Sequence, residues 1–113
     1  MPFHYDRDGN PIGLRTWAEL LDDDEYRVIA QTHIGRFFIS TVWLGTDHNF
    51  GMGPLAIFET MIFDTGAPEP HPLLNRDTYP DLEMRRYATE QDARRGHADM
   101  ISVVKTIEAL GQQ

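Results

Sequence analysis

The fold is decided by residues Val28 to Phe63, which read VIAQTHIGRFFISTVWLGTDHNFGMGPLAIFETMIF. This stretch carries only three fully charged residues, although 25% of the whole chain is charged. Its β-branched and aromatic residues are the types that favour strands. We therefore predict three strands at the centre of the fold, at residues 28–34, 36–45 and 54–63.

A two-residue hairpin is expected between the first two strands. Gly35-Arg36 separates them with glycine first, which is the signature of a type II′ turn and places Ile34 opposite Phe37. In this register one face carries Val28, Ala30, Thr32, Phe37, Ile39, Thr41 and Trp43, and the other carries Ile29, Gln31, His33, Phe38, Ser40, Val42 and Leu44. Because both faces carry large apolar groups, the sheet needs a second layer.

Two helices are predicted. Thr16 and Glu19 match a capping box, which predicts a short helix at residues 17–24. Thr89 is a good N-cap for a long C-terminal helix that Gly111 would end. The apolar stripe of this second helix consists of Ala93, His97, Met100, Ile101, Val104 and Ile107. This helix can cover one face of the sheet.

The expected fold is a single α+β domain over residues 1–113. It has an antiparallel sheet of about 4–5 strands, a short N-terminal helix and a long C-terminal helix packed on one face. Residues 64–82 are rich in proline and turn formers and are predicted to form an irregular loop. The residues that flank Asp8-Gly9 are predicted to form a small hairpin. A second copy of the chain could cover the remaining face, so we predict a homodimer.

Composition excludes several classes of protein. The formal net charge of −8 argues against a nucleic-acid surface, which needs clustered Lys and Arg. The absence of cysteine excludes disulfides, thiolate nucleophiles and Cys-ligated zinc. The five histidines are dispersed, so we predict neither a metal site nor a cofactor. The N-terminus resembles no signal peptide and no run is long enough to span a membrane, which predicts a cytoplasmic protein without membrane association.

The basic residues gather in one region of this acidic chain, at Arg85, Arg86, Arg94 and Arg95. A solvated arginine face is the expected arrangement. A local anion site is the alternative.

Two titratable residues are predicted to lie on apolar surfaces. Glu59 is in the third strand, and His97 is on the stripe of the C-terminal helix. Burying an isolated carboxylate costs on the order of several kcal/mol, so each group needs a partner. The two could pair with each other, either as a structural pair in the core or as the acid–base pair of an enzyme. We favour the structural pair, because no nucleophile accompanies them.

The loop at residues 46–53 concentrates the polar groups of the central region. Asp47, His48 and Asn49 could orient a ligand or a partner, and the glycines of the loop would let backbone amides approach an anion. Its glycines lack the spacing and the following helix of a phosphate-binding loop. Trp43 lies beside the loop and could supply affinity. We predict that the loop and Trp43 contribute to a recognition surface.

Three segments carry a resemblance to a known family. They are STVWLGTDHNF (40–50), PLAIFETMIFD (54–64) and RYATEQDARRGHADMISVV (86–104). They resemble segments of small uncharacterised proteins encoded by actinobacteria and their bacteriophages. The resemblance spans most of the chain and carries over no catalytic residue. It implies a viral accessory context in a host cytoplasm.

The expected function is that of a non-catalytic, phage-type accessory protein that binds and blocks or sequesters a host component. That component would be a host protein or a small nucleotide-like molecule. One alternative is a small enzyme in which Glu59 and His97 act on a small polar substrate. Another is a structural or assembly protein. A pocket that opens onto Glu59 or His97 would favour the enzyme, whereas an exposed aromatic patch would favour protein recognition.

Overall fold

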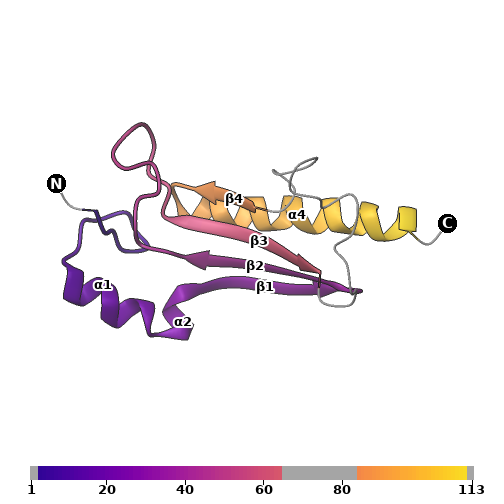
Figure 1. The fold of residues 1–113 in the computed structure, drawn as a ribbon, viewed down its shortest axis with the longest axis horizontal. Helices are drawn as coiled ribbons and strands as arrows, with labels where there is room; N and C mark the ends of the chain where they lie inside the picture. The colour runs from indigo at the N-terminus through magenta and orange to yellow at the C-terminus, as the bar shows by residue number, and fades with distance from the viewer. Residues whose placement is uncertain (1–2, 65–83, 112–113) are drawn as a thin grey trace.

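The computed structural model describes residues 3–64 and 84–111. The elements are α1 (Leu14–Leu21), α2 (Asp24–Arg27), β1 (Val28–Ile34), β2 (Phe37–Trp43), β3 (Phe58–Asp64), β4 (Met84–Tyr87) and α4 (Glu90–Gly111). The strands form one antiparallel sheet in the order β1-β2-β3-β4, with α4 lying along it (Figure 1). The predicted α+β class is therefore confirmed.

The hairpin between β1 and β2 has the predicted register. Ile34 lies opposite Phe37, and Gly35 adopts a positive φ of 56°, which glycine tolerates without strain. The predicted faces fail at the start of β1, where the register shifts between Val28 and Ala30. This β-bulge places Ile29 in the core with Trp43, whereas strict alternation had placed it on the opposite face.

The third strand is shorter than predicted and has a further strand beside it. β3 begins at Phe58 rather than at residue 54, because residues 54–57 belong to the loop that precedes it. The strand β4 pairs with β3 and ends the sheet order. After Asp64, the last residue of β3, the predicted irregular loop lies outside the described residues.

The core lies between the sheet and α4. One cluster of buried side chains joins α4 to the middle of the sheet and consists of Phe37, Ile39, Ile62, Met100, Val104 and Ile107. Burying each such side chain contributes about 1.5–3 kcal/mol. The predicted cap of α4 is confirmed, because the hydroxyl of Thr89 accepts a hydrogen bond from the Asp92 amide at 3.1 Å.

A second cluster joins the N-terminal segment to the same face of the sheet. Ile29, Trp43, Ile57, Phe58 and Ala93 are buried there, and Trp17, Leu20 and Tyr26 pack against them. The predicted capping box is wrong: α1 begins at Leu14, with Gly13 as an N-cap that makes no side-chain hydrogen bond. Tertiary contacts fix this helix instead, since the Trp17 indole donates a hydrogen bond to the Leu44 carbonyl at 2.9 Å. The small N-terminal turn is present, with Tyr5 bridging to Pro11.

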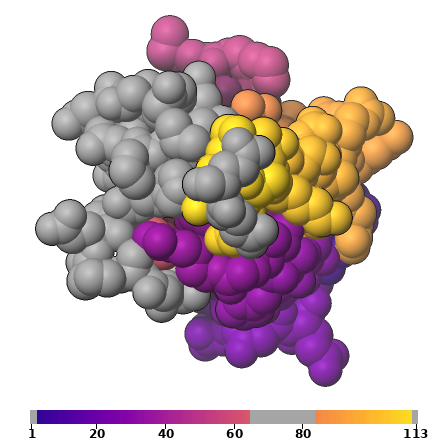
Figure 2. Space-filling model, turned by 90° about the vertical axis from the view of Figure 1, so that its right-hand side faces the viewer, coloured from indigo at the N-terminus to yellow at the C-terminus, as the bar shows by residue number. Residues whose placement is uncertain are grey.

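The opposite face of the sheet carries a row of aromatic rings. His33 and Phe38 lie with their ring centroids 4.4 Å apart, and Phe38 and Phe63 follow at 6.2 Å. Phe63 is exposed. Viewed along the sheet from the end at which α4 finishes, the β1–β2 hairpin and α4 lie against each other, and the loop between β2 and β3 projects beyond the body (Figure 2). The face turned away from α4 therefore presents aromatic groups.

Candidate recognition loop and arginine-lined groove

The predicted pair of Glu59 and His97 does not form. The carboxylate of Glu59 instead accepts a hydrogen bond from the Arg86 guanidinium at 3.1 Å on the face turned away from α4. Its neighbour Thr60 points toward α4 and belongs to the network around His97. Successive residues of a strand point to opposite faces, so the sheet itself separates the two groups.

His97 is satisfied inside the core by hydroxyl groups. Hydrogen bonds join its Nδ1 to Thr41 Oγ1 at 2.7 Å and its Nε2 to Thr32 Oγ1 at 2.9 Å, and Thr41 is joined to Thr60 at 2.5 Å. Burial lowers the pKa of His97 below its ordinary value of 6.5, so the imidazole is neutral near pH 7. A neutral imidazole has one donor and one acceptor, and the two threonine hydroxyls can match both. This network fixes how α4 sits on the sheet.

Asp47 organises the loop between β2 and β3. Its side chain is buried, and its carboxylate accepts hydrogen bonds from the amides of Asn49 at 2.9 Å, Gly51 at 2.9 Å and Ala56 at 3.1 Å. Burial raises the pKa of Asp47, but the three amide hydrogen bonds outweigh it and leave the pKa below its ordinary value. The carboxylate therefore closes the loop and is turned inward, away from the surface.

Trp43, which was predicted to contribute to the recognition surface, lies in the core beneath the loop. Its side chain is 0% exposed, and its indole donates a hydrogen bond to the Tyr5 carbonyl at 3.0 Å. At the base of the loop, His48 is half-buried and its amide donates to the Ala56 carbonyl at 3.0 Å. The Asn49 side chain is exposed and donates to the Pro54 carbonyl at 2.6 Å. Of the four predicted contact residues, Asn49 and the edge of His48 thus remain accessible.

The tip of the loop presents two large apolar side chains that the sequence analysis missed. Phe50 is 73% exposed and Met52 is 82% exposed. Phe50 adopts a φ of +52° and lies between the buried Asp47 and two glycines, Gly51 and Gly53, whose φ angles are +82° and +88°. Holding a non-glycine residue in this region costs on the order of 1–2 kcal/mol, so the surrounding loop must impose it. The available signal was the alternation of Phe and Met with glycine in Phe50-Gly51-Met52-Gly53.

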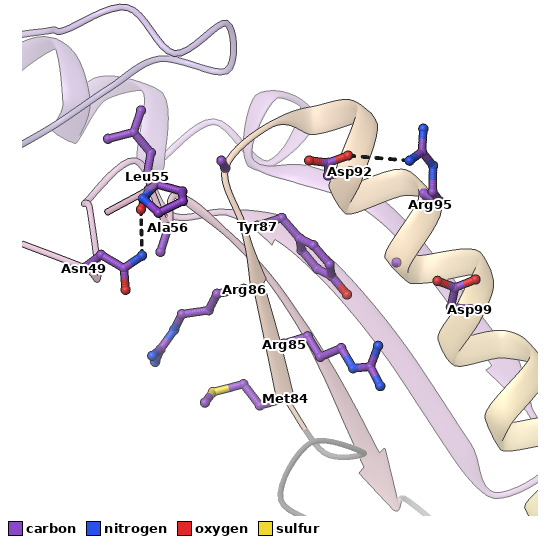
Figure 3. A pocket seen from close by; sticks show the side chains of 13 residues that line it. Asn49, Leu55, Ala56, Met84, Arg85, Arg86, Tyr87, Asp92, Arg95 and Asp99 are labelled. Atoms are coloured by element: carbon purple, nitrogen blue, oxygen red, sulfur yellow. Dashed lines mark hydrogen bonds and ion pairs between the residues drawn. The ribbon is translucent and has the colours of Figure 1, made fainter. Parts of the chain in front are cut away.

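A groove of about 870 Å³ runs along β4 beside this loop (Figure 3). One wall consists of Asn49, Pro54, Leu55, Met84 and Arg86, and the other consists of Arg85, Asp92, Arg95, Gly96 and Asp99. In Figure 3, Arg86 and Met84 lie on the side of β4 that also carries Asn49 and Leu55, whereas Arg85 and Tyr87 lie on the side of α4. Arg85 and Arg86, two of the four arginines of the sequence cluster, therefore lie on the two sides of the strand.

Tyr87 fixes the approach of α4 to β4. A Cβ atom on Gly96 would lie 2.1 Å from the Tyr87 hydroxyl oxygen, so only glycine fits at this point of the helix. Burial raises the pKa of Tyr87. The hydroxyl is buried without a hydrogen-bond partner among the described residues: Thr60 is near, but the two oxygens do not have hydrogen-bond geometry. Tyr87 thus lines the groove through its ring.

The described residues place limits on other kinds of site. Within residues 3–64 and 84–111, no group of three or more His, Asp or Glu side chains is arranged to hold a metal ion. No helix in these ranges combines the length and the apolar character needed to cross a membrane. Comparisons of the chain with protein-family models, with curated proteins and with solved structures each gave no match. The function must therefore be inferred from the geometry of the chain itself.

Proposed function

We propose that this chain is a non-catalytic binding protein that recognises a partner protein through the tip of its β2–β3 loop. The observation that carries the proposal is the exposure of Phe50 and Met52 on a loop whose backbone is held by the buried Asp47 carboxylate. Single exposed apolar side chains are common on protein surfaces, but two that project together from one structured loop suit contact with another protein.

The energetics of the loop support binding. Burying each side chain in a pocket of the partner would contribute about 1.5–3 kcal/mol. A loop that is ordered before binding loses little conformational entropy in the complex, which preserves that gain. Asp47 supplies this order, so we assign it an indirect role in recognition.

The partner we propose is a host protein that the chain blocks or sequesters in the cytoplasm. The resemblance to proteins of actinobacteria and their bacteriophages supports this context. A protruding aromatic tip suits a pocket on another protein better than it suits a small molecule, which binds in concave sites. The small nucleotide-like ligand is therefore the weaker of the two partners considered.

A second proposal concerns self-association. We propose that two copies of the chain pair through the face that carries His33, Phe38 and Phe63. The observation in favour is the aromatic row on the face turned away from α4. A symmetric dimer would bury these rings on both copies.

The loop-tip proposal is tested by capture from an actinobacterial lysate, with bound proteins quantified by mass spectrometry. We expect at least one protein to bind the wild-type chain and to be lost when Phe50→Ser and Met52→Ser are combined. The matched control combines Leu14→Ser and Leu110→Ser, which replace two exposed apolar residues elsewhere on the chain. A captured protein that is retained by the loop-tip variant and lost by the control would contradict the proposal.

A further inference from the structure

Among residues 3–64 and 84–111, β4 is the last strand of the sheet, and the groove follows this strand. Within the described residues, β4 has β3 on one side and the groove on the other. The walls of the groove come from both faces of the sheet, because Arg86 and Met84 lie on one side of β4 and Arg85 lies on the side of α4. A guest that lay in this groove would therefore lie in the plane of the sheet, alongside β4.

This geometry suits an extended backbone. A peptide that adds to the last strand of a sheet gains main-chain hydrogen bonds and directs alternate side chains to the two faces. One set of side chains would meet Pro54, Leu55 and Met84 on the loop wall. The other set would meet the first turns of α4, where the absence of a side chain on Gly96 lets the helix lie close to β4.

Charge selects among extended segments. The groove is lined by three arginines and two aspartates, and one of the arginines, Arg86, is already paired with Glu59. The charge that a guest could meet is therefore that of Arg95. Arg95 is exposed, and its nearest acidic partner is Asp92 at 3.9 Å, a separation that leaves the guanidinium able to bind another carboxylate. Pairing of β4 with a second copy of itself would bring the arginine pairs together, and like charges in opposite positions destabilise strand pairing.

From these observations we propose that the groove beside β4 binds an extended acidic segment of the partner protein, which adds to the sheet as a strand next to β4. The proposal rests on the proposed function, since it names the form in which the partner binds. Phe50 and Met52 would contact the partner's folded surface, and the groove would hold a strand that continues from it.

The test uses a fluorescein-labelled peptide of four Glu-Val repeats and measures its anisotropy with the wild-type protein. We expect saturable binding with a Kd below about 1 mM, and no binding of four Lys-Val repeats. Arg95→Glu should weaken binding by at least about tenfold, because it replaces attraction by repulsion. Lys105→Glu makes the same change of charge on the exposed side of α4 and should leave the Kd unchanged.

Backbone pairing is tested separately. Two Glu-Val peptides are N-methylated, one at the odd-numbered amides and the other at the even-numbered amides. In an extended strand only one of these sets of amides faces β4, so one of the two methylated peptides should fail to bind. If both bind as well as the parent peptide, or if the parent peptide does not bind, the strand-addition proposal is wrong. The peptide assay does not require the partner that the loop tip is proposed to bind. If the peptide binds but no protein is captured through the loop tip, the proposed function is wrong and the groove assignment stands. If a protein is captured through the loop tip but the peptide does not bind, the groove assignment is wrong and the proposed function stands.

Discussion

Replacement of Asp47 by asparagine tests whether one buried carboxylate holds the recognition loop. Oδ1 accepts the amides of Asn49 and Ala56, and Oδ2 accepts the amide of Gly51. In Asp47→Asn, a single carbonyl oxygen can keep two of these hydrogen bonds. The amide nitrogen would face the Gly51 amide, so two donors would oppose each other.

The expected loss follows from these contacts. A hydrogen bond to a charged group contributes about 1.5–3 kcal/mol, and the two remaining bonds weaken when the acceptor becomes neutral. Relief from burying the charge offsets part of this loss. We therefore expect Asp47→Asn to lower the free energy of unfolding by about 2 kcal/mol. Hydrogen exchange of the Gly51 amide should accelerate by roughly thirtyfold, because a loss of about 2 kcal/mol raises the equilibrium constant for local opening of the loop by that factor.

Urea denaturation and amide hydrogen exchange measure the two effects. The matched control is Asp22→Asn, at an exposed position that follows α1. The pH dependence supplies a further check. The folded pKa of Asp47 is lowered, so its stabilisation is complete above the ordinary value of 3.8 and is lost as the pH falls through the folded pKa. The reasoning would be refuted if the free energy of unfolding of Asp47→Asn lay within about 0.5 kcal/mol of the wild-type value and the exchange rate of the Gly51 amide were unchanged.

Three further predictions follow from the core and the open face. The pKa of His97 is lowered in the folded state, so its contribution to stability should be complete above pH 6.5 and should decline as the pH falls below that value. In thermal melts between pH 7.5 and 5, His97→Gln should flatten this decline. A dependence of the melting temperature on pH that is unchanged by the substitution would contradict the assignment. Gly96→Ala should destabilise by about 1–2 kcal/mol, because overpacking against Tyr87 exceeds the gain in helix propensity, whereas Tyr87→Phe should be neutral or stabilising in urea melts. Light scattering at micromolar concentration should give twice the 13.0 kDa chain mass, and Phe63→Glu should return the monomer; a wild-type monomer throughout excludes the dimer.

Local patterns predicted much of the sheet and the long helix. The glycine-first pair at Gly35-Arg36 determined the hairpin register, and the spacing from Ala93 to Ile107 identified the buried stripe of α4. The start of α1 was mispredicted because packing of Trp17 against Leu44 overrode the capping preference of Thr16. Local sequence cannot show that contact, which spans the chain.

The candidate site was predicted in position but not in detail. The sequence located the loop, yet it could not show that Asp47 points inward or that Trp43 is buried. The amides of the loop itself, including that of Ala56, hold the Asp47 carboxylate, and the N-terminal segment holds Trp43 through the Tyr5 carbonyl. The bulge at Ile29 was equally hidden, since nothing in the alternation of β1 marks it. The arginines were noted as a cluster, but their separation onto two sides of β4 depends on the pairing of that strand with β3.

The central claim, recognition through the loop tip, is tested most directly by isothermal titration of a captured host protein into the wild-type chain and into the combined Phe50→Ser and Met52→Ser variant. Both side chains are exposed, so the thermal midpoint of the variant should match that of wild type. The account predicts at least about thirtyfold weaker binding by the variant, since two well-packed interface side chains together contribute about 2 kcal/mol or more. An equal Kd for the two proteins, with the fold intact, would contradict it.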